Sequence, residues 1–318
     1  MKKANWYTTA SMILVLLNTF SSCQSHSSQK EQVASPIVQA HRGGAAEYPE
    51  NTIAAILHAV SIGTPVLEMD LHITSDSQVV VSHDAFLHAA KILKPDGSQI
   101  TEEQARNYTI YTMTYDSLKR YDAGSLFNPQ YLHRKQISSH IPLVSELIDS
   151  VETFVASHQL SPVCYNIEIK SWPDKDNIYT PDYQTFADLC MKELLAKKLG
   201  RRLTIQCFDA RTLNYLHKQY PQVTLSYLIE PEKDIDFISQ LKRLTFLPPI
   251  ISPHYQLVNE KLIHYAKQNK IQIIPWTVDD PKEVERLTRL GVDAIITNQP
   301  TNRCATMDKK LLSQLKVR

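Results

Sequence analysis

Short apolar runs alternate along the chain with longer segments in which apolar residues recur every three or four positions. The runs that predict β-strands are 37–40, 65–71, 79–82, 162–169, 203–207, 223–229, 249–252, 271–277 and 293–297. The segments that predict helices are 52–61, 143–158, 183–198, 210–219, 235–241, 259–269 and 281–290. We expect Asn51 to be the N-cap residue of the first helix. Apolar strands that alternate with helices are typical of a parallel sheet covered by helices.

The number of strand–helix units predicts how this sheet is arranged. About eight units in one domain predict an α/β fold of the (β/α)8 class, a TIM-type barrel. A doubly wound open sheet is the alternative, because an alternating pattern does not show whether the sheet closes on itself.

One segment after the second strand region interrupts the alternation. Residues from about 85 to 140 are polar and rich in aromatic residues. Long loops inside compact domains are usually lids or binding elements. We therefore expect an inserted lid over the carboxyl end of the barrel, where active sites of such folds lie. The alternative is a solvated excursion with no role in binding.

The N-terminus has the features of a targeting segment. Two lysines precede the apolar run 12–17, which is too short to span a bilayer, and Cys23 follows small residues as at a lipoprotein cleavage site. We expect a signal peptide at 1–22, a polar tether at 23–36 that is lipid-anchored through Cys23, and a barrel domain at 37–318. The expected location is the cell envelope, periplasmic or at the outer-membrane surface. An ordinary secreted protein is the alternative.

Composition and charge exclude several kinds of partner and site. Basic and acidic residues number 34 and 33, so the chain lacks an electrostatic footprint for nucleic acid. Seven glycines and no Gly-rich loop mean that a phosphate must be held by side chains or by a metal. Beyond Cys23, the cysteines have no C-x-x-C spacing, which disfavours zinc and redox sites and leaves disulfide status open. These cysteines are Cys164, Cys190, Cys207 and Cys304.

Carboxylates stand at the ends of two predicted strands. Glu68 and Asp70 are two residues apart on one strand, so both side chains point to the same face. Glu168 ends another apolar strand and can complete a set of oxygen ligands. Three carboxylates suit one divalent cation, Mg²⁺ or Ca²⁺, better than zinc. The alternative is that these acids are ordinary solvated groups.

Histidines and cationic residues accompany these carboxylates. His41 and His83 close two strand-like runs and can transfer protons near neutral pH. Arg42 carries a permanent positive charge and donates hydrogen bonds but does not transfer protons, so we expect it to bind a phosphate. Lys170 points the same way as Glu168 and can neutralise charge on phosphate oxygens or form a salt bridge with a neighbouring carboxylate.

These residues lie in motifs that together resemble a known family. The motifs are His41-Arg42-Gly43, Pro49-Glu50-Asn51-Thr52, Glu68-Met69-Asp70, His83-Asp84 and Glu168-Ile169-Lys170. Their order and spacing are similar to those of the glycerophosphodiester phosphodiesterase family, from about residue 37 to about residue 300. The site that the resemblance implies has His41 and His83 as catalytic residues, Arg42, Lys170 and Trp276 as phosphate or substrate contacts, Glu68, Asp70 and Glu168 as metal ligands, and Glu50 in support.

Three positions depart from the family pattern. Ser77 stands where glycine is usual, Cys207 where serine is usual and Asn298 where aspartate is common. Because none of these changes removes a metal ligand or an acid–base group, we expect them to affect peripheral contacts only. His58 and His72 match no catalytic position of the family and are expected to be structural.

The resemblance implies metal-dependent hydrolysis of glycerophosphodiesters to glycerol 3-phosphate and an alcohol, by two-histidine acid–base catalysis. Which histidine is the acid, and whether water or the 2-hydroxyl of the substrate attacks, stays open. Two other functions stay open: phospholipase-type cleavage of intact lipid head groups, and non-catalytic binding of a phosphodiester by a lipoprotein. The expected partners are a small glycerophosphodiester and, only through the Cys23 anchor, a membrane.

Overall fold

The computed structural model describes residues 35–304. The predicted signal peptide, Cys23 and nearly all of the tether lie outside the described residues, so the lipid anchor stays a prediction. The side chain of Cys304 also lies outside the description. Within it, Cys164, Cys190 and Cys207 are free thiols, and no helix has both the length and the apolar character needed to cross a bilayer.

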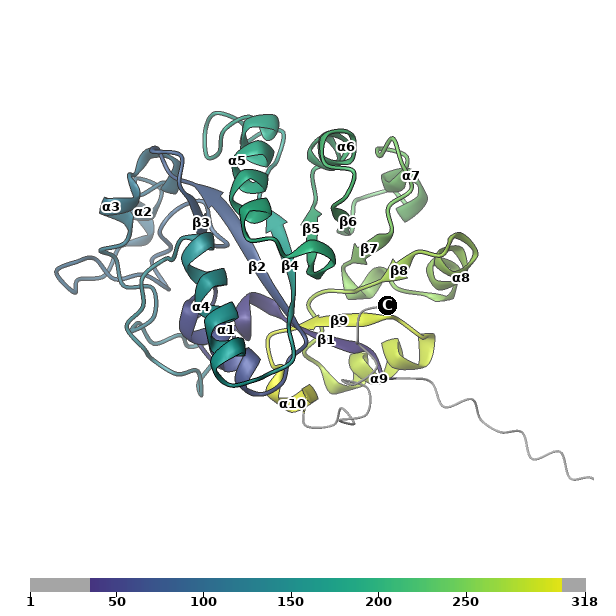
Figure 1. The fold of residues 1–318 in the computed structure, drawn as a ribbon, viewed down its shortest axis with the longest axis horizontal. Coiled ribbons are helices and arrows are strands. Elements are labelled where there is room, and N and C mark those ends of the chain that lie inside the picture. Colours follow the sequence, from purple (N-terminus) through teal and green to yellow (C-terminus); the bar gives the residue numbers. More distant parts are fainter. Residues whose placement is uncertain (1–34, 305–318) are drawn as a thin grey trace, which may run out of the picture. The chain divides into compact units, whose positions relative to one another are not determined.

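Eight strands of the described chain form a parallel sheet in the order β8-β7-β6-β5-β4-β2-β1-β9. Their bounds are β1 Ile37–Ala40, β2 Val66–Ile73, β4 Cys164–Ile169, β5 Leu203–Cys207, β6 Thr224–Ile229, β7 Ile250–Pro253, β8 Gln272–Ile273 and β9 Ala294–Thr297. The two ends of the sheet meet, because the backbone N–H of Asp293 donates to the carbonyl of Ile273 at 3.1 Å and that of Ile296 donates to Pro275 at 2.9 Å. The sheet is therefore the predicted (β/α)8 barrel and not an open sheet (Figure 1).

Helices lie outside the strands, as the alternating pattern predicts (Figure 1). They are α1 Ile53–Ser61, α4 Val144–Ser157, α5 Tyr183–Ala196, α6 Ala210–Gln219, α7 Phe237–Leu241, α8 Glu260–Asn269, α9 Pro281–Leu290 and α10 Thr301–Cys304. In β2, Leu67 and Met69 are buried in the core shared with the helices, whereas Glu68 on the other face is directed into the barrel. Thr52, not Asn51, caps α1, because the Thr52 side chain accepts the Ala55 N–H. The Asn51 side chain is thereby left for the site described below.

The strand-like run after β2 does not belong to the barrel. β3 (Val79–Val81) pairs with β2 in the antiparallel direction. This hairpin brings the chain back along β2, so that the Ser82 N–H donates to the Asp70 carbonyl at 2.9 Å. His83 therefore reaches the carboxyl end of the barrel from a returning hairpin, whereas His41 follows the end of a parallel barrel strand.

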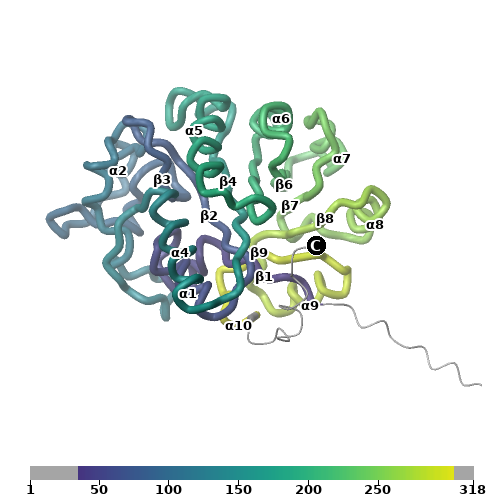
Figure 2. Tube along the Cα trace, in the orientation of Figure 1, coloured from purple at the N-terminus to yellow at the C-terminus, as the bar shows by residue number. Residues whose placement is uncertain are grey.

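The insertion between β3 and α4 has a small core of its own. It contains α2 (Glu102–Ala105), η2 (Ile110–Thr112) and α3 (Tyr115–Leu118). Its apolar cluster is separate from the main core and consists of Val80, Leu87, Ile92, Ile100, Ala105, Ile110, Leu118 and Ile141. The segment lies beside β3, α1 and α4, away from α7 and α8 (Figure 2). The insertion is thus a packed element, and its role as a lid stays a prediction.

Candidate active site

The loop after β1 holds two site residues in an uncommon backbone conformation. The short helix η1 (His41–Gly43) follows β1 directly, and Arg42 has a φ of 52°, which non-glycine residues rarely adopt. Gly43 has a φ of 82°, and a Cβ at this position would come within 2.8 Å of Ala55. The loop is therefore pressed against α1, and His41 and Arg42 both line the cavity at the barrel mouth.

Glu68 and Asp70 of β2 meet Glu168, which lies near the carboxyl end of β4. One oxygen of each carboxylate lies within 4.8 Å of the others, and the residues are 1%, 1% and 6% exposed, respectively. The parallel register of β2 and β4 sets Asp70 opposite Glu168. The structure thus brings together the three residues that the sequence predicts as metal ligands.

Neighbouring donors orient two of these carboxylates. Gln206 Nε2 donates to Glu68 Oε1 at 2.9 Å, and the backbone N–H of Arg42 donates to Glu68 Oε2 at 2.8 Å. Asn51 Nδ2 donates to Asp70 Oδ2 at 2.9 Å. Supporting hydrogen bonds of this kind fix the direction in which a carboxylate presents its remaining lone pairs.

Two cations balance part of this negative charge. Lys170 Nζ lies 3.0 Å from Glu168 Oε1 and 3.6 Å from Asp70 Oδ1, and Arg42 Nε lies 3.3 Å from Asp70 Oδ2. Burial raises the pKa of Glu168 to about 7, and burial together with the Asp70 charge raises the pKa of Glu68 well above its ordinary value. Asp70 Oδ1 accepts no hydrogen bond within the described part of the chain. This donor set fits a divalent cation, whose charge would keep the crowded acids ionised.

An amide holds His41. Its Nδ1 lies 2.6 Å from Asn298 Oδ1, and Asn298 Nδ2 donates to Asp279 Oδ2 at 2.7 Å. Because the amide group donates to Asp279, its oxygen faces His41 and accepts the Nδ1 proton. Burial, together with the charge of the neighbouring Arg42, lowers the pKa of His41 to about 3. His41 is therefore neutral at pH 7 with its lone pair on Nε2, and the expectation that Asn298 affects only peripheral contacts is wrong.

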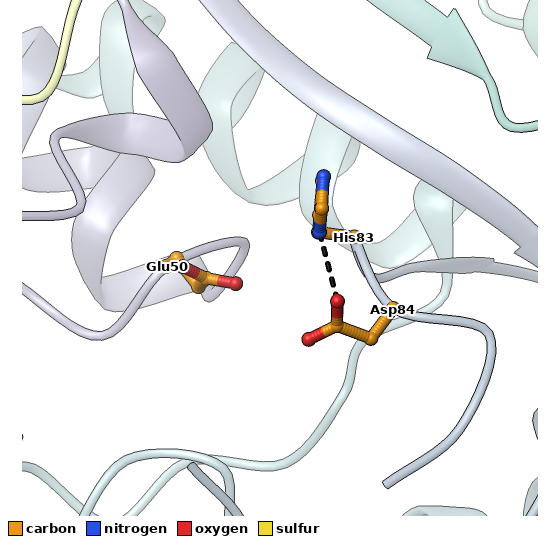
Figure 3. A group of neighbouring side chains, drawn as sticks. All are labelled: Glu50, His83 and Asp84. Atoms are coloured by element: carbon orange, nitrogen blue, oxygen red, sulfur yellow. Dashed lines mark hydrogen bonds and ion pairs between the residues drawn. The ribbon is translucent and has the colours of Figure 1, made fainter. Parts of the chain in front are cut away.

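A carboxylate holds His83. His83 Nδ1 donates to Asp84 Oδ1 at 2.9 Å (Figure 3), and burial lowers the pKa of His83 below its ordinary value. His83 and His41 line the same cavity, which has a volume of about 320 Å³. With each Nδ1 engaged, each histidine keeps its Nε2 for chemistry in that cavity.

Two further carboxylates, those of Glu50 and Asp84, lie beside His83, and a lysine of the insertion forms ion pairs with both. Lys91 Nζ lies 2.7 Å from Asp84 Oδ2 and 2.9 Å from Glu50 Oε1. Glu50 also accepts Arg42 Nη1 with both oxygens, each at 3.2 Å. Glu50, His83 and Asp84 lie close enough for a metal site (Figure 3), but the ammonium already bridges the two carboxylates. Glu50 is thus placed to orient Arg42. The sequence motifs did not indicate that Lys91 would pair with Glu50.

Aromatic side chains form one wall of the 320 Å³ cavity. Trp276 meets Phe208 edge to face with ring centroids 5.4 Å apart, and Phe208 stacks on Trp172 at 5.0 Å. Trp276 Nε1 donates to the Ser252 carbonyl at 2.9 Å, which fixes the indole ring. The structure therefore places Trp276 at the cavity, where its ring can contact substrate carbons.

His72 and His58, which the sequence predicts to be structural, contact other parts of the protein. His72 is buried and hydrogen-bonds the carbonyl oxygen of His83 at 3.2 Å through Nε2. His58 pairs with Glu47 at 2.9 Å and stacks on Tyr48 with ring centroids 4.3 Å apart. These contacts agree with the interpretation of both residues as structural.

Similarity to known proteins extends over most of the chain. A glycerophosphodiester phosphodiesterase of Caldanaerobacter subterraneus subsp. tengcongensis is 26% identical over 264 residues, which cover 83% of this chain and 94% of that protein. A lysophospholipase D of Homo sapiens is 26% identical over 303 residues, or 87% of each protein. A phosphodiesterase of Oleispira antarctica, solved with the product sn-glycerol-3-phosphate, has a TM-score of 0.64 at 20% identity and covers 86% of this chain and 97% of that one. The last comparison shows a shared fold.

The family match gives the similarity its boundaries. The Glycerophosphoryl diester phosphodiesterase family matches residues 41–302. This span begins at His41 and contains every predicted site residue. The expected resemblance is confirmed, and the chain belongs to the glycerophosphoryl diester phosphodiesterase family.

Proposed function

We propose that the chain uses one divalent cation, Mg²⁺ or Ca²⁺, to hydrolyse glycerophosphodiesters to glycerol 3-phosphate and an alcohol. One observation carries the proposal: two of the three clustered carboxylates, two cationic side chains and two histidines line one cavity, and the third carboxylate, Asp70, has an oxygen within 4.8 Å of the other two. Membership of a phosphodiesterase family supports the reaction class. Binding alone would not need two groups that are placed to move protons.

Charged side chains account for the expected stabilisation of the phosphate. Glu68, Asp70 and Glu168 would hold the cation, which when bound would polarise the phosphate and offset its negative charge. Arg42 and Lys170 can donate to phosphate oxygens that gain charge in the transition state. Burial opposes the charge on Arg42 and Lys170, but the neighbouring carboxylates outweigh burial and raise the pKa of both groups.

The histidines account for the two proton transfers. The histidine that acts as base accepts the proton of the attacking hydroxyl at its free Nε2. The histidine that acts as acid must enter the step as the imidazolium, with a proton on both ring nitrogens, and it donates its Nε2 proton to the leaving alkoxide oxygen. Asn298 and Asp84 hold the rings of His41 and His83 in one tautomer through the Nδ1 atoms. Attack by water gives the two products directly. Attack by the 2-hydroxyl of glycerol gives a cyclic phosphate, which water then opens.

The proposed reaction is tested by identifying the products. The purified chain is incubated with Mg²⁺ or Ca²⁺ and either glycerophosphocholine or its diacylated parent lipid, and the phosphorus species are followed by NMR. Release of glycerol 3-phosphate and choline is expected. Cleavage of only the diacylated parent lipid would instead establish the phospholipase-type function, and binding of the diester without turnover would establish the binding-protein function.

The location is a separate proposal, which the N-terminal sequence supports. We expect a mature protein that begins at a lipidated Cys23 and is anchored in the cell envelope. Mass spectrometry of the N-terminal peptide checks this. An unmodified Cys23, or cleavage elsewhere, would contradict the anchor and favour secretion.

A further inference from the structure

A second cavity adjoins the site, between the insertion and the segment that follows β4. It has a volume of about 250 Å³. His83, Lys170 and Trp172 line both this cavity and the 320 Å³ cavity described above. A phosphodiester has two ester arms, and one candidate phosphate-binding residue, Lys170, lies where the two cavities meet. A diester bound there can therefore place one arm in each cavity.

The walls of the two cavities differ in chemistry. The 320 Å³ cavity has the aromatic wall of Trp172, Phe208 and Trp276. The 250 Å³ cavity shares Trp172 and Lys170 with it, lacks Phe208 and Trp276, and adds two cationic residues, Arg106 and Lys175, together with hydroxyl-bearing side chains. The aromatic wall suits carbon atoms, whereas the cationic wall suits an anionic group.

Arg106 is the cation in this wall that is best placed to bind an added anion. Lys170 lies 3.0 Å from Glu168 Oε1, and Lys175 lies 2.7 Å from Asp174 Oδ2. The guanidinium of Arg106 has no ion pair with any residue of the described segment 35–303. An arginine fork matches the geometry of a carboxylate or phosphate group.

The negative charge in the wall of this cavity is largely balanced. Asp84 is its one acidic lining residue within the described chain. The Asp84 carboxylate accepts His83 Nδ1 at 2.9 Å and lies 2.7 Å from Lys91 Nζ. An anion in the cavity would thus face Arg106 and Lys175 with little opposing charge, whereas an added cation would be repelled by both.

We propose that this second cavity, the head-group cavity, receives the alcohol arm of the diester and favours alcohols that carry an anionic group, with Arg106 as the specificity-determining residue. This inference rests on the proposed hydrolysis of glycerophosphodiesters. It gives the insertion a role, because Arg106 follows α2 of the insertion and Phe86 of the same segment also lines the cavity.

A matched pair of substrates isolates the anionic group. Glycerophosphoserine and glycerophosphoethanolamine have the same glycerol phosphate and the same amine and differ by one carboxylate. We expect kcat/KM to be about three- to tenfold higher for the serine diester, as one partly exposed arginine–carboxylate contact allows. The preference should appear mainly in KM and should shrink as salt is raised, because screening weakens exposed charge pairs.

Arg106→Gln should bring the ratio of the two kcat/KM values close to one, mainly by lowering kcat/KM for the serine diester. The matched control is Arg120→Gln, which removes another exposed arginine of the insertion that does not line either cavity. This control should keep the wild-type ratio. Lys175→Gln should lower the ratio less than Arg106→Gln, because Lys175 already pairs with Asp174.

Two outcomes would overturn the inference: equal kcat/KM for both diesters in the wild type, or a serine preference that survives in Arg106→Gln. If the wild type hydrolyses no glycerophosphodiester at all, the proposed function fails instead. The two failures are therefore distinguishable, because the first requires measurable turnover of the ethanolamine diester.

Discussion

At the scale of single residues, the two histidines differ in the partner that holds each ring. His41 donates to a neutral amide, Asn298, whereas His83 donates to the carboxylate of Asp84. A carboxylate at Nδ1 favours the protonated imidazole more strongly than a neutral amide oxygen does. The surroundings of the two rings therefore separate their proton affinities, as a reaction with one acid and one base requires.

Replacing either histidine should remove one proton transfer while the fold survives. We expect His41→Ala and His83→Ala each to lower kcat by about 10²- to 10⁴-fold. Circular dichroism and thermal melting provide the check that each variant is folded, and His58→Ala serves as a control away from the cavity. A well-folded variant with nearly wild-type turnover would show that the replaced histidine is not catalytic.

Asn298→Asp should change the proton affinity of His41. A carboxylate in place of the amide would stabilise protonated His41 and raise its pKa, which burial now holds at about 3. Whether His41 acts as base or acid, the limb of the pH–rate profile that it controls should move to higher pH, by about one unit. Superimposable profiles of kcat/KM for the variant and the wild type would contradict the assigned contact.

At the scale of elements, one side chain of the insertion links two charged groups of the site. Lys91 links Asp84, which orients His83, to Glu50, which orients Arg42. Folding of the insertion around its own apolar cluster thus positions groups that lie outside it. This connection gives the inserted segment a structural role at the site whether or not it moves as a lid.

Lys91→Met should therefore impair catalysis without removing any group that touches the substrate. With the ammonium gone, Asp84 and Glu50 lose their shared counter-charge, and we expect kcat to fall by about tenfold with a smaller change in KM. Lys91→Arg keeps the charge and should recover part of the loss. Equal kcat values for Lys91→Met and the wild type would show that the bridge does not position the site.

Local sequence pattern predicts elements better than it predicts their partners. The period-two spacing of Glu68 and Asp70 placed both carboxylates on one face, and the apolar runs marked the barrel strands. The same pattern did not show that Val79–Val81 runs antiparallel, because an apolar run has no direction. The contacts of Lys91 with Glu50 and of Asn298 with His41 were missed as well, since they join positions 41 and 257 residues apart, which no local signal connects.

At the scale of the whole molecule, one barrel positions charges from distant parts of the sequence. The sum of charges is +1 over the full chain, yet three buried acids and two cations lie together at one end of the barrel. Keeping like charges together in a buried site is unfavourable unless a ligand compensates them. This concentration of charge is the feature that the proposed cation explains.

The most direct test of the account is a metal titration of turnover with the wild type and Glu168→Gln side by side. Both proteins are first treated with EDTA, and glycerophosphodiester hydrolysis is then followed as Mg²⁺ or Ca²⁺ is added. We expect saturable activation of the wild type from a negligible rate, and no activation of a folded Glu168→Gln variant at the same metal concentrations. Full activity of the wild type in EDTA, or an unchanged activation curve for Glu168→Gln, would contradict this expectation.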